Sequence, residues 1–176
     1  MSVEVEVLNG NASLPLARPL YDAVWPPHLL ATRPWADVVF AHAELRVLVL
    51  DEAGEARCHV GIYRREITWN GRQMPIRGIG GVMTHERARR RGYASIALEA
   101  AIQTLKDEGS AAFALLFCEP HDAPFYLARG WKPFEGEIHA EQPEGHVRFA
   151  AIDPYVHDLK GRSPKDGVID LRGLPW

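Results

Sequence analysis

The interpretation of this chain starts from one stretch, Val82-Met83-Thr84-His85-Glu86-Arg87-Ala88-Arg89-Arg90-Arg91-Gly92-Tyr93-Ala94-Ser95. Its pattern predicts a short apolar strand, a basic elbow and the first turn of a helix. Downstream, apolar residues recur at helical spacing and polar residues occupy the opposite face. The apolar set is Ala94, Leu98, Ala101, Ile102 and Leu105. We therefore expect a helix that begins near Gly92 and ends at Gly109, because glycine readily adopts the left-handed conformation of a helix cap.

The start of this expected helix suits a phosphorylated ligand. A first helical turn has free backbone N–H groups and the positive end of the helix dipole. Gly92 has no side chain to keep a phosphate away. Arg89, Arg90 and Arg91 add positive charge and forked donors, which suit a pyrophosphate better than a carboxylate. The alternative interpretation is a solvated basic helix start that binds no ligand.

A family resemblance rests on this stretch. Arg89-x-x-Gly92-x-Ala94 after an apolar strand resembles the acyl-CoA signature of the GNAT N-acetyltransferase superfamily. The resemblance implies acetyl-CoA as cosubstrate, with its pyrophosphate on the helix start and its pantetheine along the strand. The residues expected to contact it are Val82, Met83, Thr84, Arg89, Arg90, Arg91, Gly92, Tyr93, Ala94 and Ser95.

Length and composition fit one soluble globular domain spanning residues 1–176. The chain is 47% apolar and has a formal net charge of −3, so its basic run at 87–91 offers too few phosphate contacts for nucleic acid. Neither a signal peptide nor a membrane-length apolar run is evident, and we expect a cytoplasmic protein that does not bind membranes. Cys58 and Cys118 fit buried thiols, and the histidine spacing predicts no metal site. An oligomer is compatible with the sequence.

The pattern of apolar residues and turn signals predicts an α/β (α+β) fold, and the resemblance implies that this fold is of the GNAT type. We expect a mixed, mostly antiparallel twisted sheet of about seven strands with about four helices. The hairpin signal Asn70-Gly71 is the strongest of the turn signals. Strands are expected at Val3–Val7, Glu44–Leu50, Arg57–Trp69, Met74–Thr84, Ala111–Phe117, Trp131–Ala140 and His146–Ile152. Besides the helix after Gly92, helices are expected before Pro26-Pro27, at Trp35–Ala43 and, capped by Asp122, at Ala123–Arg129.

Two further segments resemble members of this superfamily. Pro124-Phe125-Tyr126-x-x-x-Gly130-Trp131 is similar to the segment in which a tyrosine donates a proton to the departing CoA thiolate, which implies that role for Tyr126. Arg64-Arg65-x-x-x-Trp69-x-Gly71 and a final tryptophan distantly resemble the aminoglycoside 2′-N-acetyltransferases. Where that subfamily has a glutamate on the bulged strand, this chain has Gly80.

Amine acetylation needs three kinds of group. A primary amine with a pKa near 10.4 costs about 4–5 kcal/mol to deprotonate at neutral pH, so a base is required. Candidate bases are Glu119, His121, His85, Asp37 and the terminal carboxylate of Trp176, and Glu119 is favoured because it follows an expected central strand. Glycines 80 and 81 predict a bulge that frees the N–H groups of Val82 and Met83 to hold the thioester oxygen.

The acceptor pocket is expected to be aromatic and anionic. Trp25, Trp35 and Asp37 are candidates to face a cationic amine, although aromatic residues of this kind are more often part of a core. The apolar tail is expected to be tied down, which would bring the carboxylate of Trp176 to the amine; alternatively the tail only seals the core.

Together these expectations predict acetyl transfer from acetyl-CoA to a primary amine of a small molecule or peptide, by direct attack in a ternary complex. The alternative is a catalytically silent acyl-CoA-binding or interaction module, because the strand carboxylate is missing at Gly80.

Overall fold

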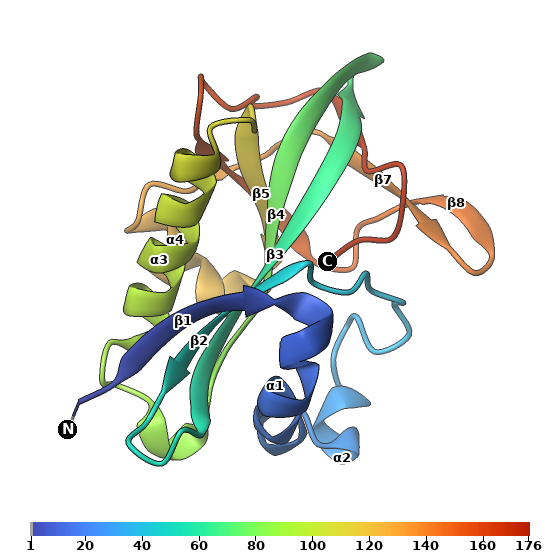
Figure 1. The fold of residues 1–176 in the computed structure, drawn as a ribbon. Coiled ribbons are helices and arrows are strands. Elements are labelled where there is room, and N and C mark those ends of the chain that lie inside the picture. Colours follow the sequence, from blue (N-terminus) through green and yellow to red (C-terminus); the bar gives the residue numbers. More distant parts are fainter. Residues whose placement is uncertain (1) are drawn as a thin grey trace.

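A ten-stranded sheet forms the centre of the computed structural model, which describes residues 2–176 (Figure 1). The strands are β1 (Glu4–Asn9), β2 (Leu45–Leu50), β3 (Ala56–Trp69), β4 (Arg72–Thr84), β5 (Phe113–Cys118), β6 (Lys132–Pro133), β7 (Glu137–Gln142), β8 (Gly145–Arg148), β9 (Asp153–Asp158) and β10 (Val168–Asp170). The helices are α1 (Gly10–Val24), α2 (Pro27–Leu30), α3 (Tyr93–Glu108) and α4 (Ala123–Leu127), with 3₁₀ turns at Glu86–Ala88 and Pro120–Asp122.

The strands pair in the order β6-β9-β5-β4-β3-β10-β7-β8, and the pair β1–β2 joins the sheet through β3. The neighbours β4–β5 and β10–β7 are parallel, whereas the other pairs are antiparallel. The predicted mixed, mostly antiparallel fold with four helices is therefore confirmed. The sheet has three more strands than the seven expected. β6 and β10 are too short to leave an alternating pattern in the sequence, and β9 lies beyond Ile152, where the last strand was expected to end.

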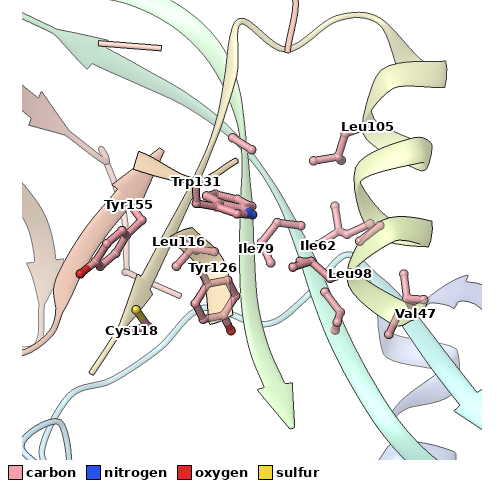
Figure 2. Close-up of a cluster of buried hydrophobic side chains, with 14 of the residues drawn as sticks. Val47, Ile62, Ile79, Leu98, Leu105, Leu116, Cys118, Tyr126, Trp131 and Tyr155 are labelled. Carbon is pink, nitrogen blue, oxygen red and sulfur yellow. The ribbon is translucent and has the colours of Figure 1, made fainter. Parts of the chain in front are cut away.

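The signature helix forms where the sequence predicts it. α3 lies between Gly92 and Gly109, which have φ angles of 77° and 65°, the left-handed conformation that glycine adopts without strain. Its buried residues Ala97, Leu98, Ala101 and Leu105 face the sheet. Figure 2 shows Leu98 and Leu105 beside the side chains of Val47 and Ile62 on β2 and β3. The apolar face of α3 thus fixes the position of its exposed N-terminal turn.

Other predicted elements are confirmed with small changes. The β3–β4 hairpin turns at Asn70-Gly71, where φ is 48° and 79°, as a type I′ turn requires. The helix before Pro26 is α1, which starts earlier than expected, after Asn9, whose side chain accepts hydrogen bonds from two N–H groups of the first turn. α4 follows Asp122, but the Asp122 side chain makes no capping hydrogen bond, contrary to expectation.

The prediction of a helix at residues 35–43 is wrong. The segment turns at Trp35 and then runs without helix, because its backbone groups bind partners elsewhere in the chain. The N–H of Ala41 donates to the carbonyl of Pro175 at 2.7 Å, and the N–H of Val39 donates to the Gln142 side chain at 3.0 Å. These long-range hydrogen bonds override local helix propensity.

Candidate active site

A bulge interrupts β4 at the position that the glycines indicate. Met83 lies opposite His59 on β3, whereas Gly80 lies opposite Gly61. Two residues of β4, Gly81 and Val82, therefore face one residue of β3, and Gly81 has a φ of 57°. The predicted bulge is confirmed. Two residues facing one leave a backbone position without its usual ladder partner at this point of the strand.

Beyond the bulge, β4 separates from β5. Their parallel pairing covers Arg77–Ile79 and Ala114–Leu116 and goes no further, although β4 continues to Thr84 and β5 to Cys118. Where the two strands still pair, the Trp176 side chain packs over both of them. Its indole N–H donates to the carbonyl of Leu115 at 3.0 Å, and a side chain at Gly78 would have its Cβ 2.2 Å from the indole.

The tail is tied down as predicted, since Trp176 is only 4% exposed. Besides the contact of Ala41 with Pro175, the Arg65 guanidinium donates to the carbonyls of Leu171 and Leu174 at 3.1 and 3.0 Å. It also lies 5.2 Å from the ring centre of Trp176. The main-chain carbon of Trp176 consequently lies at the bulge, where a Cβ on Gly80 would be 3.2 Å from it.

A cavity of about 590 Å³ opens where β4 and β5 part. Its walls come from α1, the segment after α2, both separated strands and α4, and it includes most of the residues expected on the acceptor side. Among the lining residues are Trp25, Trp35, Val82, Glu119, Tyr126 and Trp176. Asp37 is exposed and does not line the cavity. The fold therefore brings together sequence-predicted residues that are far apart in the chain, up to the 151 positions that separate Trp25 from Trp176.

The start of α3 has the geometry that a pyrophosphate needs. The first backbone hydrogen bond of the helix joins the N–H of Ile96 to the carbonyl of Gly92, so the preceding amides have no such partner. A Cβ on Gly92 would meet nothing within 4 Å, which leaves the approach open. Arg89, Arg90 and Arg91 are exposed around it. These residues fit a CoA pyrophosphate.

Arg129 lies in this neighbourhood, although no sequence pattern singled it out. Its guanidinium donates to the hydroxyl of Ser95 at 2.6 Å and lies 3.8 Å from the ring centre of Phe125. It thereby joins the end of α4 to the first turn of α3 and adds a positive charge there.

Tyr126 lies on α4 against the sheet, next to Leu116 and Cys118 (Figure 2). The residue is 7% exposed and lines the cavity, and its hydroxyl makes no hydrogen bond within residues 2–176. Burial, followed by the nearby Cys118, raises the pKa of Tyr126 above its usual value. The hydroxyl therefore stays protonated at neutral pH and can act as a donor. Burial also raises the pKa of the Cys118 thiol, to about 12.

Glu119 follows β5 and is held by two partners. Its carboxylate forms an ion pair with Arg33 and accepts a hydrogen bond from the Trp35 indole at 3.4 Å. Trp35 packs edge-on against Trp25, with ring centres 4.9 Å apart. Of the other candidate bases, His121 lines the cavity, whereas His85 accepts the N–H of Arg87 and caps a 3₁₀ turn.

Sequence reasoning missed a buried network beneath the bulge. Arg46 donates to the carbonyl of Gly10 at 3.0 Å and to the Tyr21 hydroxyl at 3.1 Å, and its Nη1 lies 2.8 Å from Nε2 of His59. Nδ1 of His59 lies 2.7 Å from the carbonyl oxygen of Gly81. A signal was available, since Arg46 is the one charged residue in the apolar run Leu45–Leu50.

Residues 2–176 contain no group of three or more histidine, cysteine, aspartate or glutamate side chains that could hold a metal ion. Among the helices of the same residues, none has the length and apolarity that a membrane crossing needs.

Sequence comparison identifies one family. Residues 20–134, well over half of the chain, match the family described as acetyltransferase (GNAT) domain. No curated protein is significantly similar to the chain in sequence.

Solved structures of low sequence identity share the fold. The GNAT family N-acetyltransferase YhbS from Escherichia coli, crystallised in complex with CoA, is 15% identical with a TM-score of 0.66, over 97% of this chain and 89% of that chain. Escherichia coli ElaA is 16% identical with a TM-score of 0.62, over 89% of this chain and 100% of that chain. A GNAT family acetyltransferase from Brucella melitensis, in complex with acetyl-CoA, is 12% identical with a TM-score of 0.60, over 96% of this chain and 94% of that chain.

Proposed function

This chain belongs to the GNAT acetyltransferase family, and from that premise we propose that it transfers the acetyl group of acetyl-CoA to a primary amine of a small molecule or peptide. One observation carries the proposal. The bulge at Gly81, the hydroxyl-bearing Tyr126 and the end of Trp176 line the same cavity, at the point where β4 and β5 part. A donor thioester and an acceptor amine can meet there without leaving the protein, so the amine attacks directly in a ternary complex.

On the donor side, the amides of residues 90–95 bind the pyrophosphate and the strand residues Val82–Thr84 bind the pantetheine. The open approach at Gly92 supports this arrangement, as do the CoA and acetyl-CoA complexes of YhbS and the Brucella melitensis protein. When bound, acetyl-CoA supplies an acetyl thioester and a thiolate leaving group. Arg89, Arg90 and Arg91 add charge that draws the anionic ligand to the helix start.

At the reacting centre, the N–H groups of Val82 and Met83 hold the thioester oxygen. Val82 lies in the bulge, and β4 no longer pairs with β5 beyond Ile79, so N–H groups on that side of the strand have no ladder partner. Tyr126 donates a proton to the leaving sulfur, a role that its place on the cavity wall and its free hydroxyl support. The raised pKa of Cys118 keeps its sulfur protonated, which disfavours an acyl-cysteine intermediate and supports direct attack.

On the acceptor side, Trp25 and Trp35 form an aromatic wall and the carboxylate that Trp176 carries in this chain binds the ammonium group. A terminal carboxylate with an ordinary pKa of about 3.3–3.7 is a weak base, so binding is its first role and proton removal through water its second. Glu119 is the other proposed base, and it must loosen its ion pair with Arg33 to act.

The first experiment measures thiol release from acetyl-CoA in the presence of a panel of amines. Acceptor-dependent release supports acetyl transfer. The second candidate function, a silent acyl-CoA-binding module, is favoured by Gly80 at the bulge and by the pairing of Glu119 with Arg33. CoA binding without release for any amine would establish that alternative.

The role of the Trp176 carboxylate has its own test, in which a few residues are added after Trp176. The added residues move the carboxylate away while the indole keeps its hydrogen bond to Leu115. An unchanged melting temperature with a raised KM for the amine supports the role, and unaltered acceptor kinetics rule it out.

A further inference from the structure

The buried guanidinium of Arg46 points to a second charge on the acceptor. We infer that the acceptor amine also carries an anionic group, a carboxylate, and that Arg46 binds this group inside the cavity. The inference rests on the proposed acetyl transfer and specifies its substrate class: amino-acid-like compounds, which carry an amine and an acid on one small body.

Arg46 is a buried charge whose protein partners are all neutral. The residue is 4% exposed, and its hydrogen bonds go to the Gly10 carbonyl, the Tyr21 hydroxyl and the His59 ring. Within residues 2–176 no carboxylate lies within 4.0 Å of its nitrogens, and its Nη2 makes no hydrogen bond. A buried guanidinium without an anion is unfavourable, because it has lost its hydration, and an anionic ligand would offset this cost.

His59 offers no negative charge and cannot serve as the missing partner. Its Nδ1 faces the Gly81 carbonyl oxygen, which only accepts, so Nδ1 carries the proton and donates. Nε2 then has a lone pair and accepts from Arg46. Burial, with a smaller contribution from the charge of Arg46, lowers the pKa of His59 to about 4 despite the opposing hydrogen bond to Gly81, so the ring is neutral at physiological pH.

The other acidic residues around the cavity are paired with other side chains or lie too far from Arg46 to form an ion pair with it. Glu119 is paired with Arg33, and Asp122 lies 3.4 Å from His121. Asp22 lines the cavity from an exposed position on α1 and makes no ion pair with Arg46. The carboxylate of Trp176 lies at Gly80 and is also absent from the partners of Arg46 within the 4.0 Å limit. Among residues 2–176, the cavity therefore contains one buried cation without an anion.

The position of Arg46 suits a compact acceptor. A Cβ on Gly81 would lie 3.2 Å from the Tyr21 hydroxyl, so the partner of Arg46 reaches the bulge itself. The Trp176 carbon lies against the preceding residue, Gly80. A cation-binding group and an anion-binding group thus flank neighbouring residues of β4, a separation that one small zwitterion can span. Polycationic acceptors such as aminoglycosides would place a charge against Arg46 and are disfavoured.

The test compares matched acceptors that differ only in the acid. Thiol release is measured with L-amino acids and with the corresponding amino-acid amides, and the ratio of their kcat/KM values is taken for each variant. Wild type should prefer the acids. Arg46→Met should lower this ratio by about 10–100-fold, the usual strength of a hydrogen bond to a charged group.

Arg18→Met is the matched control, since Arg18 also lines the cavity but is exposed. It should keep the acid preference. If Arg46→Met does not fold, Arg46→Lys, which retains the charge at a shorter reach, should keep a reduced preference. Equal or better turnover of the amides by wild type overturns the inference, as does an unchanged ratio in the Arg46 variants.

A second pair of acceptors, ethanolamine phosphate and ethanolamine, separates phosphate from carboxylate. A stronger preference for this phosphate than for the amino acids overturns the carboxylate assignment.

A binding experiment separates the proposed acetyl transfer from the proposed Arg46 site. It measures the binding of an N-acetyl amino acid and of its amide by calorimetry, without acetyl-CoA. One outcome is that no acceptor supports thiol release, while wild type but not Arg46→Met binds the N-acetyl amino acid more tightly than its amide. That outcome removes the proposed function and leaves the Arg46 site standing. Turnover without acid preference leaves the function and removes the site.

Discussion

The proposed site has a donor end at the start of α3 and an acceptor end in the cavity, and the two ends are built on different principles. At the donor end, the consecutive residues 89–95 present backbone amides and exposed arginines at the start of α3. At the acceptor end, Arg46, His59 and Gly81 come from three different strands and are joined by hydrogen bonds beneath the bulge, with Tyr21 from α1. The first is local and exposed, whereas the second is assembled by the tertiary structure and mostly buried.

The difference teaches where charge is effective. Exposed arginines are screened by water and salt, so they attract a ligand without fixing its shape. A buried guanidinium is screened far less, and its direction is fixed by three neutral partners. The donor end can thus bind a common cosubstrate through backbone groups, while the acceptor end selects its substrate through side chains.

Tyr126 lies between the two ends, and its replacement should have the largest effect. Tyr126→Phe should lower turnover by about 10²–10⁴-fold, the usual contribution of a general acid, because only the hydroxyl that protonates the leaving sulfur is lost. CoA affinity, measured by calorimetry, should not change, because the ring and its packing against Trp131 remain. Turnover within about twofold of wild type across the pH range would make Tyr126 a structural residue.

The buried end should be sensitive to acid. The folded-state pKa of His59 is about 4 and its usual value is 6.5, so its stabilising contribution is complete above pH 6.5. As the pH falls from 6.5 toward 4, the unfolded chain binds the proton first and about 3 kcal/mol of the free energy of unfolding is lost. Urea unfolding at a series of pH values measures this loss.

The matched comparison for this acid sensitivity is His59→Gln against His28→Gln, since His28 is exposed. The His59 variant should show a flatter pH dependence than wild type in this range, and the His28 variant should not. Parallel curves for wild type and His59→Gln would mean that the His59 network is not what acid disrupts.

The donor end should be sensitive to a side chain on Gly92. Gly92→Val should weaken CoA binding by about 10–100-fold, because it fills the approach to the amides and strains a positive φ. Gly54→Val is the control: Gly54 has the same φ of 77° and equally open surroundings, in the turn between β2 and β3.

Both glycine variants should therefore lower the melting temperature alike, and only Gly92→Val should raise the Kd for CoA. A Kd that is unchanged in Gly92→Val, or raised equally in both variants, would remove the pyrophosphate from the start of α3.

The smallest effect is expected at Cys118, which lies at the end of β5 beside the cavity. Its pKa, raised to about 12, leaves the sulfur as a thiol, so Cys118→Ser should change turnover by no more than about threefold. An acyl-cysteine intermediate predicts the opposite, a loss of turnover together with an acetylated Cys118 detectable by mass spectrometry in wild type.

The sequence was sufficient wherever a feature depends on near neighbours in the chain. Gly92 and Gly109 bound α3, Asn70-Gly71 turns the β3–β4 hairpin, and Gly81 marks the bulge. In each case glycine, or asparagine beside it, adopts a positive φ that other residues avoid. Helical periodicity likewise identified the buried face of α3. The donor end follows from these local features, and the sequence therefore predicts it.

The tertiary structure alone decided the acceptor end. No periodicity showed that β9 pairs with β5, that residues 35–43 hydrogen-bond with the tail, or that Glu119 is neutralised by Arg33. The same holds for Arg46, whose neutral surroundings are supplied by side-chain and backbone groups of α1, β3 and β4. Backbone conformation is set within a few residues, whereas the energy of a buried charge is set by whatever the fold places around it, which can come from any part of the chain.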